Sequence, residues 1–415
     1  MCSRGRLGSK NHAGKAKRGF TRRRFVGGTA AATATAAVVL SGCTDSSSSG
    51  SALSYTGESQ VIDDTQILDV TDEYEYVDDT GLEATYTWTL PLGTILFHTE
   101  GMWCAAILSP ESALMVNTLG AVSLNSGTVN TLLEDPVTGS GYDFYDVRCS
   151  SGVFAWVEED FSSSTWALYG QKFTGGVLMD SPTLLDSGDE DWEPAKFETT
   201  GTSVIWQKMP FASGSKSTEY SHCYRWSVGD EEGTELYESP GRFATSPRVS
   251  DGILTIAPRV LEDEGTYYGM TAIDLDSLAI VDQLVMPASV RPFEATYINN
   301  LFAFSVEANY GYGGSLGNMG SYIGREGDVY VNLSREPLAC IVGDGGTRFF
   351  IKVKSSHYVV DTDAETYSVL TAPGDSLDYG DYPASEGTST QLVTYSTVRG
   401  DDGAPESVTM RVFDL

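Results

Sequence analysis

A short serine motif is the first place in this chain where residue types and spacing suggest catalysis. Gly313-Gly314-Ser315-Leu316-Gly317 matches G-x-S-x-G, a pattern in which a serine at a sharp turn between a strand and a helix acts as a nucleophile. Here the motif lies inside a glycine-rich segment, and the three histidines beyond residue 43 are widely separated. We therefore expect no serine triad and predict no catalytic residue.

Two long segments combine tyrosine, aspartate and glycine, a composition typical of adaptable binding loops. Residues 307–328 are rich in glycine, which makes a loop mobile, and residues 373–386 are rich in aspartate. Tyrosine adds flat, amphipathic contact area at a low entropy cost. The candidate contact residues for a sugar or a peptide are Tyr310, Tyr312, Tyr322, Asp378, Tyr379, Asp381 and Tyr382. The alternative is that both segments are surface loops without a ligand.

Acidic residues could also hold a metal ion. Residues 189–191 with Glu193, and Asp143 with Asp146, bring carboxylates together, but their spacing matches no EF-hand or nonapeptide calcium pattern. The four cysteines beyond residue 43 are separated by 45, 74 and 117 residues, which does not fit a paired-cysteine zinc site. We predict no metal ligand and no cofactor, and a bound divalent cation is the open alternative.

The same four cysteines bear on covalent stabilisation. They are Cys104, Cys149, Cys223 and Cys340. A chain of this length buries enough apolar surface to fold without disulfides, so we expect single buried thiols. The alternative is one disulfide that joins neighbouring structural units, which a location outside the cytoplasm would permit.

The N-terminal 43 residues resemble a bacterial export signal. The run Thr21-Arg22-Arg23-Arg24-Phe25-Val26 resembles the twin-arginine core of Tat signals, with Arg22, Arg23 and Phe25 as its key residues, and Leu40-Ser41-Gly42-Cys43 resembles a lipoprotein lipobox. This resemblance implies removal of residues 1–42, acylation of Cys43, and anchoring to the outer side of the cytoplasmic membrane. The apolar segment 26–40 has 15 residues, fewer than the roughly 20 of a membrane-spanning helix.

Removal of the signal leaves a strongly acidic protein. Residues 1–42 contain nine of the 26 Lys and Arg and none of the 57 Asp and Glu, so the mature chain has a net charge of −40. Such a surface repels nucleic-acid phosphates and anionic lipid headgroups, so we expect no nucleic-acid partner and membrane contact only through the lipid anchor. Residues 43–60 are rich in Ser and Gly and predict a flexible tether.

Residues 61–415 contain a repeat of short apolar strands. Ala105, Ala155, Ile205, Leu254, Phe302, Phe350 and Val393 mark the most apolar strand of each unit, and they are separated by 50, 50, 49, 48, 48 and 43 residues. No segment shows a helical apolar period. A repeat of 40 to 50 residues with about four strands is typical of a β-propeller blade. The sequence therefore predicts an all-β, seven-bladed propeller of four-stranded antiparallel blades, with six or eight blades as alternatives.

The third unit shows the expected strands most clearly, at residues 194–199, 203–208, 220–228 and 234–238. The seventh unit stops after its third strand, and a strand-like segment at residues 60–70 precedes the first unit. Because an unpaired sheet edge is a liability, we expect this N-terminal strand to complete the last blade. Trp156, Trp206 and Phe304 occupy equivalent positions and are expected to pack between blades.

These units resemble the TolB-type and prolyl-oligopeptidase-type propeller repeat. The residues that carry the resemblance are Glu193-Pro194-Ala195-Lys196-Phe197, Ser246-Pro247-Arg248-Val249 and Arg291-Pro292-Phe293-Glu294, each ahead of an apolar strand. Ile273-Asp274-Leu275 and Val412-Phe413-Asp414-Leu415 close the third strand of their units. The resemblance implies the fold over residues 85–415 and leaves the function open.

The expected function follows from location and loop composition. In propellers the loops between the second and third strands, and those between blades, gather on one face around the axis. We expect a non-enzymatic binding or scaffold module for an envelope protein or a glycan, acting through this face. The alternative is a metal-assisted hydrolase or lyase that works at the axial tunnel.

Overall fold

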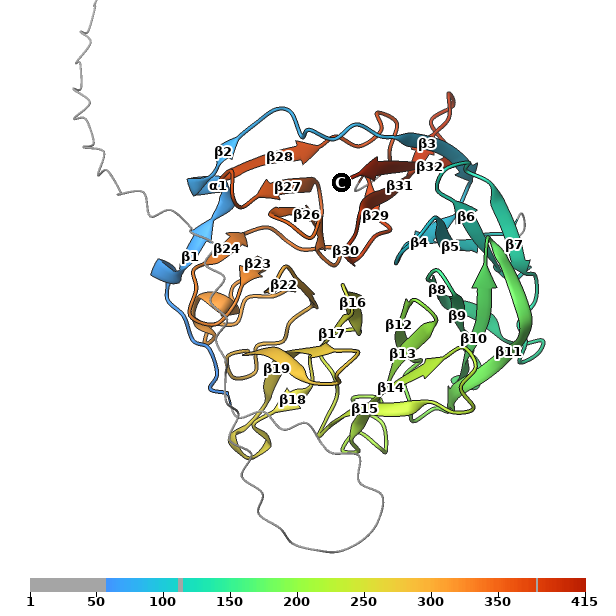
Figure 1. The fold of residues 1–415 in the computed structure, drawn as a ribbon, viewed down its shortest axis with the longest axis horizontal. Helices are drawn as coiled ribbons and strands as arrows, with labels where there is room; N and C mark the ends of the chain where they lie inside the picture. Colours follow the sequence, from blue (N-terminus) through green and yellow to red (C-terminus); the bar gives the residue numbers. More distant parts are fainter. Residues whose placement is uncertain (1–56, 111–114, 378–379) are drawn as a thin grey trace, which may run out of the picture. The chain divides into compact units, whose positions relative to one another are not determined.

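The computed structural model describes residues 57–110, 115–377 and 380–415. The predicted export signal with Arg22, Arg23 and Phe25, and the predicted lipidation site Cys43, lie outside these residues. The described strands form seven sheets that surround a central axis (Figure 1). The predicted all-β propeller is therefore confirmed.

The first three sheets along the chain have four antiparallel strands each, named here from the axis outward. The first contains β4 (Ile95–Phe97), β5 (Trp103–Leu108), β6 (Thr118–Ser123) and β7 (Val129–Leu133). The second contains β8 (Asp143–Cys149), β9 (Val153–Asp160), β10 (Thr165–Thr174) and β11 (Val177–Gly188). The third contains β12 (Lys196–Thr200), β13 (Ser203–Lys208), β14 (Ser221–Ser227) and β15 (Thr234–Ser239). The strands predicted for the third unit are confirmed within two residues.

The remaining four sheets carry additional strands or borrow one from the N-terminal part of the chain. The fourth contains β16 (Arg248–Ser250), β17 (Ile253–Ile256), β19 (Tyr267–Asp274) and β20 (Ile280–Val285), with β18 (Arg259–Val260) also on β19. The fifth contains β21 (Glu294–Ile298), β22 (Leu301–Val306), β23 (Gly320–Gly324), β24 (Tyr330–Leu333) and β1 (Ile67–Asp69). The sixth contains β25 (Val342–Gly343), β26 (Arg348–Lys352), β27 (His357–Asp361), β28 (Thr366–Leu370), β2 (Glu75–Tyr76) and β30 (Gly387–Thr388). The seventh contains β29 (Tyr382–Pro383), β31 (Gln391–Arg399), β32 (Pro405–Asp414) and β3 (Tyr86–Pro91).

Helical structure in the described residues is limited to four short turns. They are η1 (Asp64–Gln66), α1 (Val70–Glu73), η2 (Glu262–Glu264) and η3 (Gly314–Gly317). None of these described helices has the length and apolar character needed to cross a membrane.

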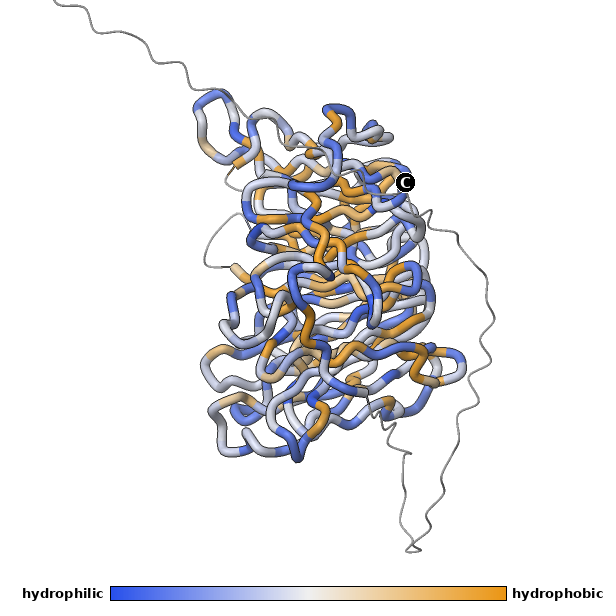
Figure 2. The backbone as a smooth tube through the Cα atoms, turned by 90° about the vertical axis from the view of Figure 1, so that its left-hand side faces the viewer, coloured by the Kyte–Doolittle hydropathy of each residue, from blue (hydrophilic) through white to orange (hydrophobic). Residues whose placement is uncertain are grey.

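The hydrophobic core lies between neighbouring sheets. The buried apolar residues of the described chain form seven clusters, and each cluster joins the facing sides of two adjacent sheets. Apolar residues accordingly fill the interior and polar residues follow the outer loops (Figure 2). Trp156, Trp206 and Phe304 are buried in three of these clusters, as predicted. The seven sequence markers each lie in a different sheet.

The chain closes the ring with a different N-terminal strand from the one predicted. β3 pairs antiparallel with β32, from Tyr86 opposite Val412 to Pro91 opposite Ser407, and so completes the seventh sheet. The predicted segment 60–70 contributes β1 instead, which pairs parallel with β24 on the outside of the fifth sheet. The prediction of N-terminal closure is correct, but its assignment to residues 60–70 is wrong. The buried apolar residues of that segment pack elsewhere: Ile62 lies in the cluster between the fourth and fifth sheets, and Val70 lies in the cluster between the fifth and sixth.

Candidate functional site

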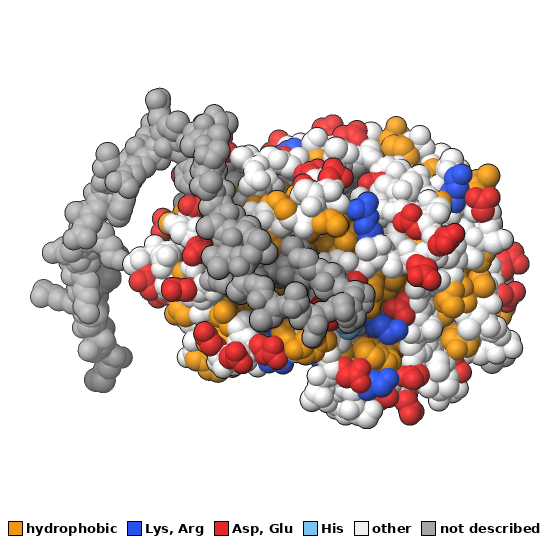
Figure 3. Space-filling view, turned by 60° about the horizontal axis from the view of Figure 1, so that its bottom comes forward, with side chains coloured by type: hydrophobic (Ala, Val, Ile, Leu, Met, Phe, Trp, Pro, Cys, Tyr) orange, Lys and Arg blue, Asp and Glu red, His pale blue; other side chains and the backbone are white. Residues whose placement is uncertain are grey.

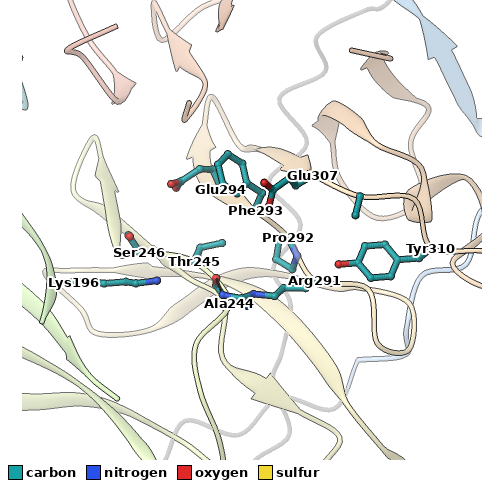
Figure 4. Close-up of a pocket in the computed structure, with 11 residues that line it drawn as sticks. Lys196, Ala244, Thr245, Ser246, Arg291, Pro292, Phe293, Glu294, Glu307 and Tyr310 are labelled. Atoms are coloured by element: carbon teal, nitrogen blue, oxygen red, sulfur yellow. Dashed lines mark hydrogen bonds between the residues drawn. The ribbon is translucent and has the colours of Figure 1, made fainter. Parts of the chain in front are cut away.

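A pocket lies among the loops on one face of the ring. This face is formed by the loops that run from the outer strand of one sheet to the inner strand of the next, so each inner strand begins there. The pocket has a volume of about 360 Å³, and its walls come from the start of β12, the loop before β16, the loop before β21 and the loop after β22 (Figure 4). Three consecutive sheets therefore build it, on the face that the sequence analysis favoured for binding.

Two cationic side chains face each other in this pocket. Lys196 and Arg291 extend toward one another near Ala244 (Figure 4), and the Arg291 guanidinium donates to the Ala244 carbonyl at 3.0 Å. Burial lowers the pKa of the Lys196 ammonium, and the charge of Arg291 lowers it further, against the opposing effect of nearby glutamates.

The acids nearest to these cations are already paired with other arginines. Glu193 Oε1 lies 2.6 Å from Arg242 Nη2, and Glu294 Oε2 lies 3.1 Å from Arg248 Nη2. Within the described residues, neither Lys196 nor Arg291 has a carboxylate oxygen within 4.0 Å. Because no carboxylate is in direct contact with them, these two cations create a local attraction for an anion.

Hydroxyl groups and an aromatic ring complete the pocket. Thr245 is 1% exposed, and its Oγ1 has no hydrogen-bond partner among the described residues. Ser246 adds a second hydroxyl at the same wall, and the hydroxyl of Tyr310 points toward the cations (Figure 4). A buried hydroxyl without a partner carries a desolvation penalty, which a ligand could remove. The pocket thus offers cationic and hydroxyl donors beside an aromatic face.

Glu294 connects the pocket to a cluster of buried charges around the axis. Arg248, whose side chain is 5% exposed, is the centre of this cluster. Its guanidinium lies 3.1 Å from Glu294, 3.3 Å from Glu386 and 3.9 Å from Glu198. Arg148, at the inner strand of the second sheet, contributes a second guanidinium. Arginines therefore neutralise the axial carboxylates.

The pKa values of two of these carboxyl groups are shifted in opposite directions. Burial raises the pKa of Glu198, and the nearby charge of Glu386 raises it further. For Glu386, the effect of burial is overcome by the guanidiniums of Arg248 and Arg148 and by a hydrogen bond from Glu198, so its pKa is lowered. We infer that Glu198 is the protonated partner and that Glu386 is the ionised one.

Glu198→Gln is expected to become more stable relative to wild type as the pH rises. The folded-state pKa of Glu198 is raised above its ordinary value of 4.5, so between the two values the folded protein binds a proton that the unfolded chain has lost. Wild-type stability therefore falls as pH rises through this window, and the glutamine variant lacks that loss. The measurement is the melting temperature of both proteins from about pH 5 to about pH 8. Exposed Glu326→Gln is the control, and a pH-independent difference for Glu198→Gln would contradict the assignment.

The predicted contact residues of the glycine-rich segment have three different environments. Tyr310 lines the pocket. Tyr312 is 66% exposed, and its ring centroid lies 6.2 Å from that of Tyr310. Tyr322 belongs to β23 and is 1% exposed, and its hydroxyl donates to the carbonyl oxygens of Ser315 and Asn318. The structure therefore places Tyr322 in the core, because the predicted loop ends where β23 begins at Gly320.

The two described contact residues predicted in the second segment, Asp381 and Tyr382, do not line the pocket. Asp381 is 2% exposed, forms an ion pair with Arg411, and accepts a hydrogen bond from Thr394 at 3.1 Å. Tyr382 packs 6.1 Å from the ring of Tyr395. Both residues thus hold the inner strand of the seventh sheet against β31 and β32. Asp378 and Tyr379 lie outside the described residues.

Ser315 of the G-x-S-x-G motif is held by hydrogen bonds to the N-terminal segment. It lies in η3, where its Oγ donates to Asp64 at 2.6 Å and its backbone N–H donates to the Ile62 carbonyl. His357 belongs to the sixth sheet, and Asp344 pairs with Arg348 at 2.8 Å. These residues form no triad with Ser315.

A second pocket borders this turn and has an acidic lining. It has a volume of about 470 Å³ and lies between the N-terminal segment and the fifth sheet. Its acids are Asp64, Asp69, Asp72 and Glu73. Asp64 and Asp69 accept hydrogen bonds from Ser315 and Ser334, respectively, so they fasten the N-terminal segment to that sheet.

Two of the acids considered as metal ligands are engaged by protein groups. Asp146 pairs with Arg148 at 2.6 Å, and Asp191 accepts from Ser215 at 2.6 Å. In the part of the chain that the structure describes, one other set brings three suitable ligand atoms within 4.8 Å of one another: His222, Glu235 and Glu238, on the third sheet. His222 is already 2.8 Å from Glu235.

All four cysteines of the propeller are buried as free thiols. Burial raises the pKa of each thiol, which suppresses the reactive thiolate. For a chain that begins at Thr44, we expect four reactive thiols in denaturant without reductant and close to none in the native state. The measurement is a titration with a thiol-specific chromophore, and two thiols in denaturant would show that a disulfide forms.

Sequence reasoning missed the axial charges, although a signal was present. Arg148, Glu198, Arg248 and Glu294 recur at intervals of 50, 50 and 46 residues, which is close to the spacing of the apolar markers. A charged residue that recurs with the period of a buried strand indicates an axial position in a propeller.

The chain is similar to solved propeller structures at low identity. No protein-family model matches it, and no curated protein is significantly similar in sequence. A puromycin hydrolase matches with 13% identity over 79% of this chain and 53% of its own, with a TM-score of 0.48. A structure from a study of two prolyl endopeptidases matches with 12% identity over 77% and 46%, with a TM-score of 0.47. The propeller domain of the Pyrococcus furiosus Trilobed protease matches with 12% identity over 63% and 80%, with a TM-score of 0.43. The chain spans about half the length of the puromycin hydrolase, and these similarities concern the fold alone.

Proposed function

We propose that the protein is an exported, lipid-anchored, seven-bladed β-propeller that binds an envelope protein or a glycan without catalysing a reaction. The observation that carries this proposal is the pocket on the loop face. Lys196 and the buried Thr245 hydroxyl have no partner there among the described residues, and Arg291 donates only to the Ala244 carbonyl, so these polar groups remain available to a ligand.

Sequence motifs support the cellular location. Arg22, Arg23 and Phe25 resemble a Tat signal, and Cys43 completes a lipobox. The tether of residues 43–60 would hold the propeller away from the headgroups, which its acidic surface repels. Acidic side chains are spread over the face seen in Figure 3, where cationic ones are sparse. The lipid would therefore make the membrane contact and leave the loop face available.

The alternative function is a metal-assisted hydrolase or lyase at the axis. Its support is the raised pKa of Glu198, since a buried carboxyl group that titrates near neutrality can act as a general acid or base. Against it, Arg248 and Arg148 occupy the positive positions beside the axial carboxylates, where a catalytic cation would have to bind. We therefore favour the binding module. A rise in melting temperature with added Ca²⁺, reversed by a chelator, would instead favour the enzyme.

The proposed function is tested by crosslinking in intact cells. Wild type and Arg291→Glu are treated with formaldehyde, purified through the lipidated chain, and examined for attached protein and carbohydrate. Arg325→Glu is the matched control, because Arg325 is exposed on the turn between β23 and β24, which belongs to the opposite face. We expect Arg291→Glu to lose adducts that wild type and Arg325→Glu both form. The same adducts in all three proteins would contradict binding at the loop face.

A further inference from the structure

The donors and acceptors of the pocket distinguish between classes of ligand. Lys196 and Arg291 supply adjacent positive charges, and Thr245 lies beside them at the same wall (Figure 4). On another side, Glu307 is exposed and forms no hydrogen bond or ion pair with a described residue. The pocket thus pairs a site for one anionic group with a free carboxylate acceptor.

We propose that this pocket binds a sugar residue that carries a carboxylate, such as a uronic acid unit within a larger neutral glycan. The inference rests on the proposed function, because it names the ligand class of the same site. The sugar carboxylate would contact Lys196, Arg291 and Thr245. The ring hydroxyls would donate to Glu307, and the C–H face of the ring would lie against Tyr310 and Pro292.

The size and charge of the site favour one acidic sugar over a polyanion. A pocket of about 360 Å³ is at the small end of the range for ligand sites, which suits one or two sugar rings. The chain repels distant anions, so recognition depends on contacts inside a partly enclosed pocket, where screening is weaker than at the surface. A peptide carboxylate would also satisfy the cations, but its donors for Glu307 would be mainly backbone N–H groups, whereas a sugar ring presents several hydroxyl groups together.

Thr245 provides a variant that separates binding from folding. Its Oγ1 is buried without a partner, so Thr245→Val removes a desolvated hydroxyl, keeps the shape and is expected to fold normally. Thr255 is the matched control, because it is also fully buried with an unpartnered Oγ1 but does not line the pocket. Only Thr245→Val is expected to weaken ligand binding.

The test is calorimetric titration of the full lipidated protein in detergent micelles. The probe is glucuronosyl-xylobiose, and the comparison ligands are its carboxyl-reduced form, inorganic phosphate, and a tripeptide with a free C-terminus. We expect the acidic sugar to bind at least tenfold more tightly than any of the other three. Lys196→Met, Arg291→Gln and Thr245→Val should each weaken binding of the acidic sugar at least fivefold, and Thr255→Val should not change it.

The outcomes separate this inference from the proposed function. Equal binding of the reduced sugar, tighter binding of phosphate or the tripeptide, or no binding of the acidic sugar would overturn the inference. If, in that case, Arg291→Glu still loses its crosslinked adducts in cells, binding at the loop face stands with a different ligand class. If Arg291→Glu forms the same adducts as wild type, the proposed function falls as well.

Discussion

Arg248→Met should reduce the free energy of unfolding by about 3–5 kcal/mol, the range for removing one member of a buried ion pair. Arg248 is buried and lies within 4 Å of the carboxylates of Glu294, Glu386 and Glu198. Its loss leaves these buried acids without their central cation, and the remaining guanidinium of Arg148 cannot replace all three contacts. Burial alone would lower the pKa of Arg248, but the neighbouring acids raise it, so the buried guanidinium stays charged.

Urea unfolding of Arg248→Met, wild type and Arg325→Met measures this effect. Arg325 pairs with Asp328 at 2.9 Å, but both side chains are about half exposed, so its loss should change stability by at most about 1 kcal/mol. A further variant that combines Arg248→Met with Glu294→Gln should recover part of the lost free energy of unfolding. It removes one of the buried carboxylate charges that Arg248→Met leaves without a cation. Equal stability of Arg248→Met and Arg325→Met would contradict the importance of the axial cluster.

Two truncations should show that β3 contributes more to thermal stability than the segment before it. A chain that begins at Thr85 keeps β3 and should still unfold cooperatively, with a lower melting temperature because Val70 and Tyr74 no longer cover the fifth and sixth sheets. A chain that begins at Leu92 lacks β3, which leaves β32 as an open edge and removes Leu90 from the cluster between the seventh and first sheets. We expect this second chain to show no cooperative thermal transition.

Point variants of β3 test its contribution to stability without truncation. Leu90 is 2% exposed, and Leu90→Ala should reduce stability by about 2–5 kcal/mol, whereas the neighbouring exposed Thr89→Ala should change it by about 0.5 kcal/mol or less. Circular dichroism during heating and denaturant titration measure both effects. A chain from Leu92 that melts like the chain from Thr85 would show that β3 does not close the ring.

The repeat was predictable because the second strand of each sheet is buried on both faces. Such a strand reads as a continuous apolar run, and residues such as Ala155, Ile205 and Phe302 recur at nearly constant intervals. The closing strand was harder to identify, because β3 is an outer strand with alternating polar residues. The apolar residues of the segment 60–70 have a different role, since Ile62 and Val70 pack into the clusters between the fourth, fifth and sixth sheets.

The binding face was predictable, but the residues of the pocket were not. Tyr310 and Tyr322 lie in one glycine-rich stretch, and only the start of β23 at Gly320 separates a pocket residue from a core residue. Glycine content alone does not locate that boundary. Lys196, Arg291 and Glu294 lie in the motifs that carry the propeller resemblance, but Lys196 is far from the other two in the sequence. Their convergence depends on how three consecutive sheets stack.

The pairing of charges was equally hidden from the sequence. Glu193 and Glu294 could each have neutralised Lys196, and the structure instead pairs them with Arg242 and Arg248. Differences of a few ångströms between neighbouring sheets decide which cation is left without a carboxylate contact. Because Lys196 is left in this way, the pocket can attract an anion.

Site-specific photo-crosslinking in the native envelope tests the central claim, that this pocket is the contact site, most directly. A photoreactive phenylalanine analogue replaces Tyr310 at the pocket or, as the control, Leu278, which is 43% exposed on a turn between β19 and β20 on the opposite face. We predict a specific protein or glycan adduct from position 310 that is absent from position 278 and is lost when Arg291→Glu is added. The same adducts from both positions, or adducts from position 278 alone, would contradict the account.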